Sequence, residues 1–181
     1  RTRQRLEIGH VAALVAAASC DFLAQAHDDD ISLPNRMVRL LALHRQSGAM
    51  LVTSAVFNLR HGAREPETFP GYDAPAIMPF ETMASTNAGF FAGARYGFHR
   101  ALYESFPYLD KAYLPLGHDV LLQFRAHALG GVLFTPERLL DYRLHEGRWS
   151  LWLRDWQNGE TREFGFCLNQ LNVIAVARRD L

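Results

Sequence analysis

The chain has 181 residues, of which 49% are hydrophobic and 21% are charged. This composition is typical of a globular protein long enough to bury one core, and it excludes a disordered chain. Lys plus Arg and Asp plus Glu are equal at 19 each, so no net positive field favours nucleic acid or an anionic membrane surface as a partner.

Membrane and export signals are weak. No apolar run reaches the roughly 20 residues that cross a bilayer, so we expect no transmembrane span. The apolar run Val11–Cys20 leads directly into Asp21, and we interpret it as a core helix rather than a secretion signal. Cys20 and Cys167 lie in apolar surroundings and are expected to be reduced core residues. Together these features predict a cytoplasmic protein, with peripheral attachment to the inner membrane face as the alternative.

The first third of the chain alternates helix and strand patterns. Helices are expected at Arg5–Ala18 and Pro34–Ser47, and strands at Asp21–Ala26 and Ala49–Phe57. Pro favours the first turn of a helix and Gly its end, so the second helix is expected to begin at Pro34 and to close at Gly48.

The rest of the chain continues this alternation after one long interruption. The segment His61–Pro79 contains four prolines and two glycines, which predicts an irregular excursion. The elements expected beyond it are a strand at Asn87–Tyr96, helices at Arg100–Phe106 and Asp119–Leu129, and strands at Val132–Thr135 and Leu139–Leu144. This order predicts an α/β sandwich.

Three consecutive carboxylates, Asp28, Asp29 and Asp30, close the apolar run that forms the first predicted strand. Like charges repel, and carboxylates beside apolar residues lose hydration, so a divalent metal or a bound cationic group would neutralise them. The alternative is a solvated acidic turn in which Asp30 caps the helix that Pro34 begins.

Segments from the middle and end of the chain carry a second pattern. They are Phe98–Glu104, Gly117–Arg125, Gly130–Leu139 and Tyr142–Ser150. Together with Asp29–Pro34 they resemble the family 2 glycosyltransferases of the GT-A fold, whose members have Asp-x-Asp-Asp, then Glu-Asp before a helix, then Pro-Glu and Tyr-Arg-x-His. The resemblance covers the chain from about Ala16 to Ser150.

The resemblance implies a GT-A-type α/β/α sandwich with a mixed central sheet, whose N-terminal nucleotide-binding strands are missing or not included here. The domain is expected at residues 1–150, with residues 151–181 as a tail packed on it. The implied activity is that of a metal-dependent inverting glycosyltransferase, which moves a sugar from a nucleotide sugar, UDP-sugar by preference, to a hydroxyl of a saccharide or lipid-linked acceptor. The implied context is cell-surface polysaccharide or glycolipid synthesis, and the implied cofactor is Mn²⁺ or Mg²⁺.

The resemblance also assigns roles on the donor side of the site. Asp29 matches the metal-binding Asp, and His145 falls where the family has a His near the diphosphate and metal. Asp28 would contact the ribose or the sugar, and Asp30 would support them. Arg143 would touch phosphate or order the loop that carries His145.

On the acceptor side, Asp119 matches the Asp that removes the proton of the acceptor hydroxyl. An Asp at the start of a helix is also kept ionised by the helix dipole, which suits a base. The chain departs from the family by having His27 and His118 where acids are usual, and His118 is expected to meet the acceptor. The aromatic run Phe90–Phe98, in particular Phe91, would shape the acceptor surface together with the excursion described above.

Two other functions remain open from the sequence. One is a non-catalytic protein that binds a nucleotide sugar or carbohydrate with the same fold and has lost turnover. The other is an unrelated metal-dependent phosphohydrolase that uses His27 with the aspartates, which leaves the segments around Asp119 and Tyr142 unexplained.

Overall fold

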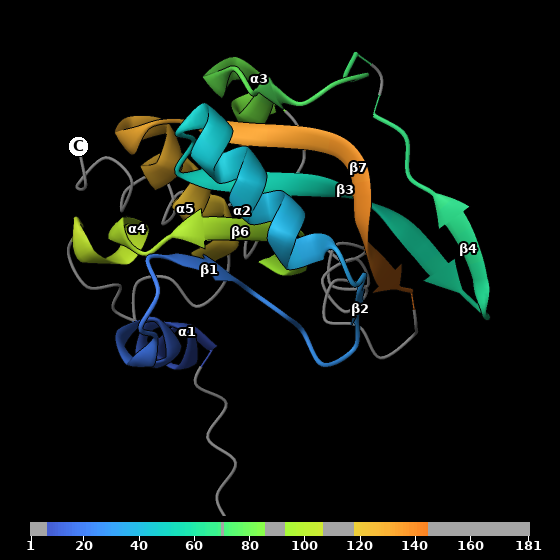
Figure 1. Cartoon of the computed structure of the whole chain (residues 1–181), viewed down its shortest axis with the longest axis horizontal. Coiled ribbons are helices and arrows are strands. Elements are labelled where there is room, and N and C mark those ends of the chain that lie inside the picture. Colours follow the sequence, from blue (N-terminus) through green and yellow to red (C-terminus); the bar gives the residue numbers. More distant parts are fainter. Residues whose placement is uncertain (1–6, 70, 86–92, 107–117, 145–181) are drawn as a thin grey trace, which may run out of the picture.

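The computed structural model describes residues 7–69, 71–85, 93–106 and 118–144, which form helices around one mixed sheet (Figure 1). The helical elements are α1 (Glu7–Ala17), α2 (Arg36–Ser47), α3 (Phe80–Ser85), the 3-10 turn η2 (Gly93–Arg95), α4 (Ala101–Glu104) and α5 (His118–Leu129). The strands are β1 (Phe22–Ala24), β2 (Ile31–Ser32), β3 (Leu51–Arg60), β4 (Ala63–Pro66), β5 (Ala76–Ile77), β6 (Tyr96–His99) and β7 (Val132–Arg143).

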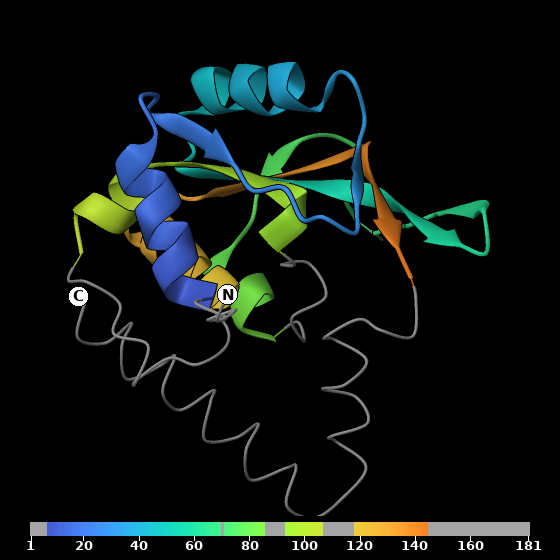
Figure 2. The same ribbon diagram turned by 90° about the horizontal axis from the view of Figure 1, so that it is seen from below.

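The sheet has the order β1-β6-β3-β7-β2, with β4 added to β3 and β5 to β7. Strands β3 and β7 are parallel and every other pairing is antiparallel. Helix α2 covers one face of the sheet, whereas α1, α3 and α5 lie on the other side (Figure 2). The predicted α/β sandwich is therefore confirmed, and its sheet is mixed.

The central strands are buried on both faces, as expected for strands between two helical layers. Along β3, Leu51 packs with Phe134 and with residues of α5, while Val52 faces the opposite way. Val52 packs with Leu40 and Leu43 of α2. The near-continuous apolar run of β3 therefore reflects two cores rather than one.

Helix α2 has the end that the sequence predicts. It stops at Gly48, whose φ of 71° is left-handed, and the Gly48 N–H donates to His44 O at 2.8 Å. Glycine takes this conformation at little cost, so it terminates helices readily. The helix begins at Arg36, two residues after Pro34, with Asn35 before it.

The excursion at His61–Pro79 is more regular than expected. Strand β4 pairs with β3 through a two-residue turn, in which His61 and Gly62 both have positive φ, 48° and 83°. Two such residues in succession match the twist of a tight β-hairpin, so the chain reverses directly. The prediction of an irregular segment is wrong here, because the turn carries no Asn-Gly or Asp-Gly signal.

Strand β7 joins what the sequence divides into two strands. It runs without a break from Val132 to Arg143 and passes through Pro136. Its pairing with β3 changes register after Ser54, where the ladder is irregular. Such an irregularity accommodates a proline that has no N–H to donate, so a proline did not end this strand.

The predicted helix at the start of the chain is present, and one side of it packs on the main core through Val11 and Val15. In α1, Val15 is buried, whereas Leu14 is 70% exposed, because only one stripe of the helix meets the sheet. Cys20 is also exposed, so the prediction of a core thiol at this position is wrong. None of the described helices has the length and apolar character needed to cross a membrane.

Candidate functional site

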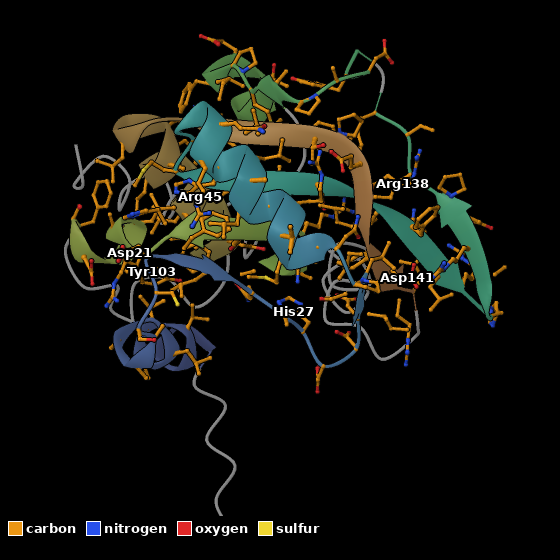
Figure 3. The ribbon with its side chains drawn as sticks, viewed as in Figure 1. Asp21, His27, Arg45, Tyr103, Arg138 and Asp141 are labelled. Atoms are coloured by element: carbon orange, nitrogen blue, oxygen red, sulfur yellow. The ribbon has the colours of Figure 1, made fainter. Side chains whose placement is uncertain are left out.

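The three aspartates lie with His27 in a turn between β1 and β2, which we call the acidic turn (residues 27–30; Figure 3 labels His27). His27, Asp29 and Asp30 each offer one ligand atom, and these atoms all lie within 4.8 Å of one another. The Nδ1 atom of His27 is 4.0 Å from Oδ2 of Asp30. Asp28 is exposed and Asp29 is half-buried, whereas the side chain of Asp30 is 2% exposed.

Asp30 connects the acidic turn to the end of β7. Its Oδ1 accepts a hydrogen bond of 2.9 Å from the backbone N–H of Arg143, across 113 residues of sequence. Strand β2 supports this contact by pairing antiparallel with β7, with Ile31 opposite Asp141. The prediction that Asp30 caps α2 is therefore wrong, since its carboxylate is turned toward β7.

This contact brings together the acidic motif and the Tyr-Arg-x-His motif. Arg143 ends β7 and is exposed, and its backbone rather than its guanidinium makes the contact with Asp30. Its predicted phosphate contact stays a prediction. His145 follows two positions later and lies outside the described residues, so its metal role also stays a prediction.

A buried arginine that sequence reasoning missed lies behind the turn. Arg36, at the start of α2, is 2% exposed and donates to Gln25 O, Ala94 O and the Ser32 hydroxyl at 2.5–2.9 Å. Burial lowers the pKa of Arg36, and the charge of Asp30 opposes that effect. The sequence places Arg36 in an ordinary helical pattern, which gives no sign that it faces inward.

Asp119 lies in the first turn of α5, as predicted, in the layer beneath the sheet (Figure 2). Asp119 lies close enough to Tyr96 and Tyr103 for its charge to act on both phenol groups. Burial raises the pKa of Tyr96 and of Tyr103, and the Asp119 charge raises each further.

The predicted acceptor residues are only partly described. His118 is the first residue of α5, and Phe91 lies outside the described residues. At the end of the aromatic run, Tyr96 and Phe98 are buried in the main core, at 0% and 2% exposure. The predicted acceptor role of this run is therefore wrong for these two rings.

Ion pairs surround the far end of β7 and the hairpin of β3 and β4. Arg95 donates two hydrogen bonds to Glu67, at 2.5 and 2.9 Å, and its guanidinium lies 5.3 Å from the ring centroid of Tyr142. Arg64 donates to Asp141, which is 2% exposed (Figure 3 labels Asp141). The contact with Arg95 helps to fix the ring of Tyr142 at the end of β7.

Helix α5 also carries a buried arginine. Arg125 is 1% exposed, donates to Leu102 O at 3.1 Å and lies 4.7 Å from the ring centroid of Phe106. These contacts join α5 to α4 and to the Phe106 ring that follows it.

Comparisons with known proteins connect this geometry to a fold. No protein-family model matches the chain, and no curated protein matches it in sequence.

Three structures of S. aureus TarS (residues 1–349) match it in fold. The complex with UDP-GlcNAc has a TM-score of 0.55 at 12% identity and covers 76% of this chain and 38% of TarS. The complex with UDP has a TM-score of 0.54 at 10% identity, and the match covers 82% of this chain and 44% of TarS. The structure without a named ligand has a TM-score of 0.53 at 12% identity, and the match covers 93% of this chain and 51% of TarS.

At these identities the likeness concerns the fold alone. It confirms the predicted GT-A-type α/β fold with a mixed central sheet. The chain spans about 38–51% of the TarS structures that it matches. The acidic turn and the end of β7 therefore lie together within a fold that a protein in complex with UDP-GlcNAc also has.

Proposed function

We propose that this chain belongs to a metal-dependent, inverting glycosyltransferase related to family 2, which transfers a sugar from a nucleotide sugar, UDP-sugar by preference, to an acceptor hydroxyl. The observation that carries the proposal is the hydrogen bond between Asp30 and the backbone of Arg143. It joins the two motifs that the resemblance assigns to the donor, in a fold shared with a UDP-binding protein.

The donor atoms of the acidic turn fit a hard divalent cation. Carboxylate oxygens and a neutral imidazole suit Mn²⁺, and carboxylates suit Mg²⁺. Asp29 would be the principal ligand, with His27 and Asp30 beside it and His145 as a further ligand. Such an ion supplies charge that stabilises the departing nucleotide diphosphate. The acidic turn holds the ligand atoms of His27, Asp29 and Asp30 within 4.8 Å of one another.

Asp119 would act as the base on the acceptor side. It would accept the proton of the acceptor hydroxyl while that oxygen attacks the sugar carbon and the bond from this carbon to the diphosphate oxygen breaks. A single displacement of this kind inverts the configuration at the sugar carbon. The position of Asp119 in the first turn of α5, close to Tyr96 and Tyr103, supports this role.

Binding of UDP and Mn²⁺ tests the proposal. At 100 times the Kd, a ligand raises the free energy of unfolding by about 2.7 kcal/mol, which raises Tm by roughly 5–10 °C for a chain of this size. We expect this shift to require both UDP and Mn²⁺ and to disappear in Asp29→Ala. The exposed Asp73, in the loop before β5, provides the control Asp73→Ala, which should keep the shift. No effect of UDP or metal on the unaltered chain would contradict the proposal.

A non-catalytic nucleotide-sugar-binding protein is the second candidate. The histidines at positions 27 and 118 favour it, since they stand where the family has acids. Slow hydrolysis of UDP-sugar without acceptor separates the two, because only an enzyme turns over. Release of UDP that stops in Asp119→Asn supports the transferase.

A further inference from the structure

Arg36 occupies an unusual position for a charged residue at the start of a helix. It is 2% exposed and its guanidinium extends beneath the acidic turn. Nη1 donates to the Ser32 hydroxyl at 2.9 Å, and Nη2 lies 2.9 Å from Gln25 O, 2.5 Å from Ala94 O and 3.4 Å from Tyr96 O. One side chain thus contacts three separate parts of the chain.

The contacts of Arg36 bracket the acidic turn. Gln25 precedes the turn and Ser32 follows it, so the guanidinium holds both ends of segment 25–32. The Ala94 and Tyr96 carbonyls belong to η2 and β6, which anchors the same guanidinium to the sheet. The planar fork of an arginine can serve several acceptors at once, whereas the ammonium of a lysine cannot reach them all.

Backbone groups hold this segment through the Arg143 N–H at Asp30 and through strand β2. Strand β2 has only two residues, and so short a ladder is a weak restraint. The side chain of Gln25 extends the network, because its Nε2 lies 2.9 Å from Nε2 of His27. The position of His27 is thereby connected to Arg36 through Gln25.

The charge of Arg36 is also matched to the turn. The side chain of Asp30 is 2% exposed, and a buried carboxylate needs a nearby positive charge. Arg36 supplies this charge from inside the protein, while its hydrogen bonds to described residues go to carbonyls and a hydroxyl. The ligand atoms of His27, Asp29 and Asp30 lie within 4.8 Å of one another in the turn that Arg36 brackets.

We propose that Arg36 is the positioning residue of the acidic turn, holding both ends of segment 25–32 on β6 so that His27, Asp29 and Asp30 bind one divalent cation. The cation part rests on the proposed function, whereas the clamp does not. Residues that orient metal ligands typically change metal affinity 10- to 100-fold when they are replaced.

The test uses two readouts on the full chain and needs no catalysis. Hydrogen exchange without metal measures the order of residues 26–32, and titration with Mn²⁺ alone, followed by its magnetic resonance signal, measures affinity. Arg36→Met keeps length but removes charge and donors, and Arg36→Lys restores the charge. Arg39→Met is the matched control, because Arg39 lies on the same helix, has a side chain 39% exposed and pairs with Glu137 on β7.

We expect Arg36→Met to speed exchange in the turn and to weaken Mn²⁺ binding at least tenfold, Arg36→Lys to recover part of both, and Arg39→Met to change neither. If Arg36→Met is folded and both readouts match the unaltered chain, the inference is overturned. If it does not fold, Arg36→Lys decides: weaker binding and faster turn exchange at an unchanged Tm support the inference, and unchanged values refute it. If the unaltered chain binds no Mn²⁺, the cation site fails and exchange alone decides the clamp.

Discussion

The acidic turn and the hairpin of β3 and β4 handle carboxylates in different ways. At the hairpin, Glu67 accepts two hydrogen bonds from Arg95, and Asp141 accepts two from Arg64. In the turn, Asp30 accepts a hydrogen bond from a backbone N–H, and the nearby Arg36 donates its hydrogen bonds to carbonyl groups and to Ser32. Acids paired with guanidinium groups stabilise the fold, whereas an acid oriented by the backbone is suited to a ligand.

The largest expected effect lies at the hairpin. Glu67→Gln leaves the charge of Arg95, whose side chain is 5% exposed, without its carboxylate. Breaking a buried pair costs about 3 kcal/mol or more in the free energy of unfolding, which urea denaturation measures. Mn²⁺ affinity should stay the same. Glu65→Gln, on an exposed residue of β4, is the control and should cost less than about 0.5 kcal/mol. Loss of Mn²⁺ binding in Glu67→Gln would remove the distinction between the two regions.

In the acidic turn, we expect a substitution to weaken Mn²⁺ binding strongly and to reduce the stability of the fold less than at the hairpin. Asp30→Asn keeps an oxygen that can accept from the Arg143 N–H, and Arg36 keeps its hydrogen bonds but loses the nearby charge of Asp30, so we expect a stability loss of about 1–2 kcal/mol, smaller than at the hairpin. Mn²⁺ affinity should fall at least tenfold. Isothermal titration and urea denaturation on the same sample measure both. A variant that is strongly destabilised yet binds Mn²⁺ normally would assign Asp30 to the fold alone.

The smallest effect concerns the Arg39–Glu137 pair, which is half-exposed. The hydrogen bond from Arg39 holds the pKa of Glu137 below its ordinary 4.5. Because the unfolded chain then binds a proton first, the pair stabilises the fold above pH 4.5 and loses this effect as the pH falls. We expect Arg39→Met to lower the free energy of unfolding slightly at neutral pH and by less at pH about 3.5. If the difference in the free energy of unfolding between the unaltered chain and Arg39→Met grows as the pH falls, the result contradicts this expectation.

Local signals in the sequence predict much of the fold. Pro34 and Gly48 delimit α2 closely, and the apolar spacing of Asp119–Leu129 predicts α5 to within a residue. The hairpin escapes prediction because His61 takes a positive φ that a His rarely adopts. The single strand β7 escapes it because a proline inside a strand ordinarily marks an end.

The candidate site is predictable in part. The cluster of aspartates is evident from the sequence alone, since it is local. The partner of Asp30 is 113 residues away, and two contacts of Arg36 are 58 and 60 residues away. No local pattern encodes such pairs. The motif resemblance placed the acidic turn and β7 in one site, but it did not indicate Arg36 or the hairpin ion pairs.

The pairing of β2 with β7 also bears on how the chain folds. It joins Ile31 to Asp141, so the ends of most of the described chain must meet before it forms. Closing so long a loop costs entropy that grows with its length, and contacts of this kind tend to form late. A ladder of two residues contributes little stabilising enthalpy to offset this entropy cost. The acidic turn therefore acquires its final shape only once the rest of the sheet exists, and the cation binding that we propose there would report that folding is complete.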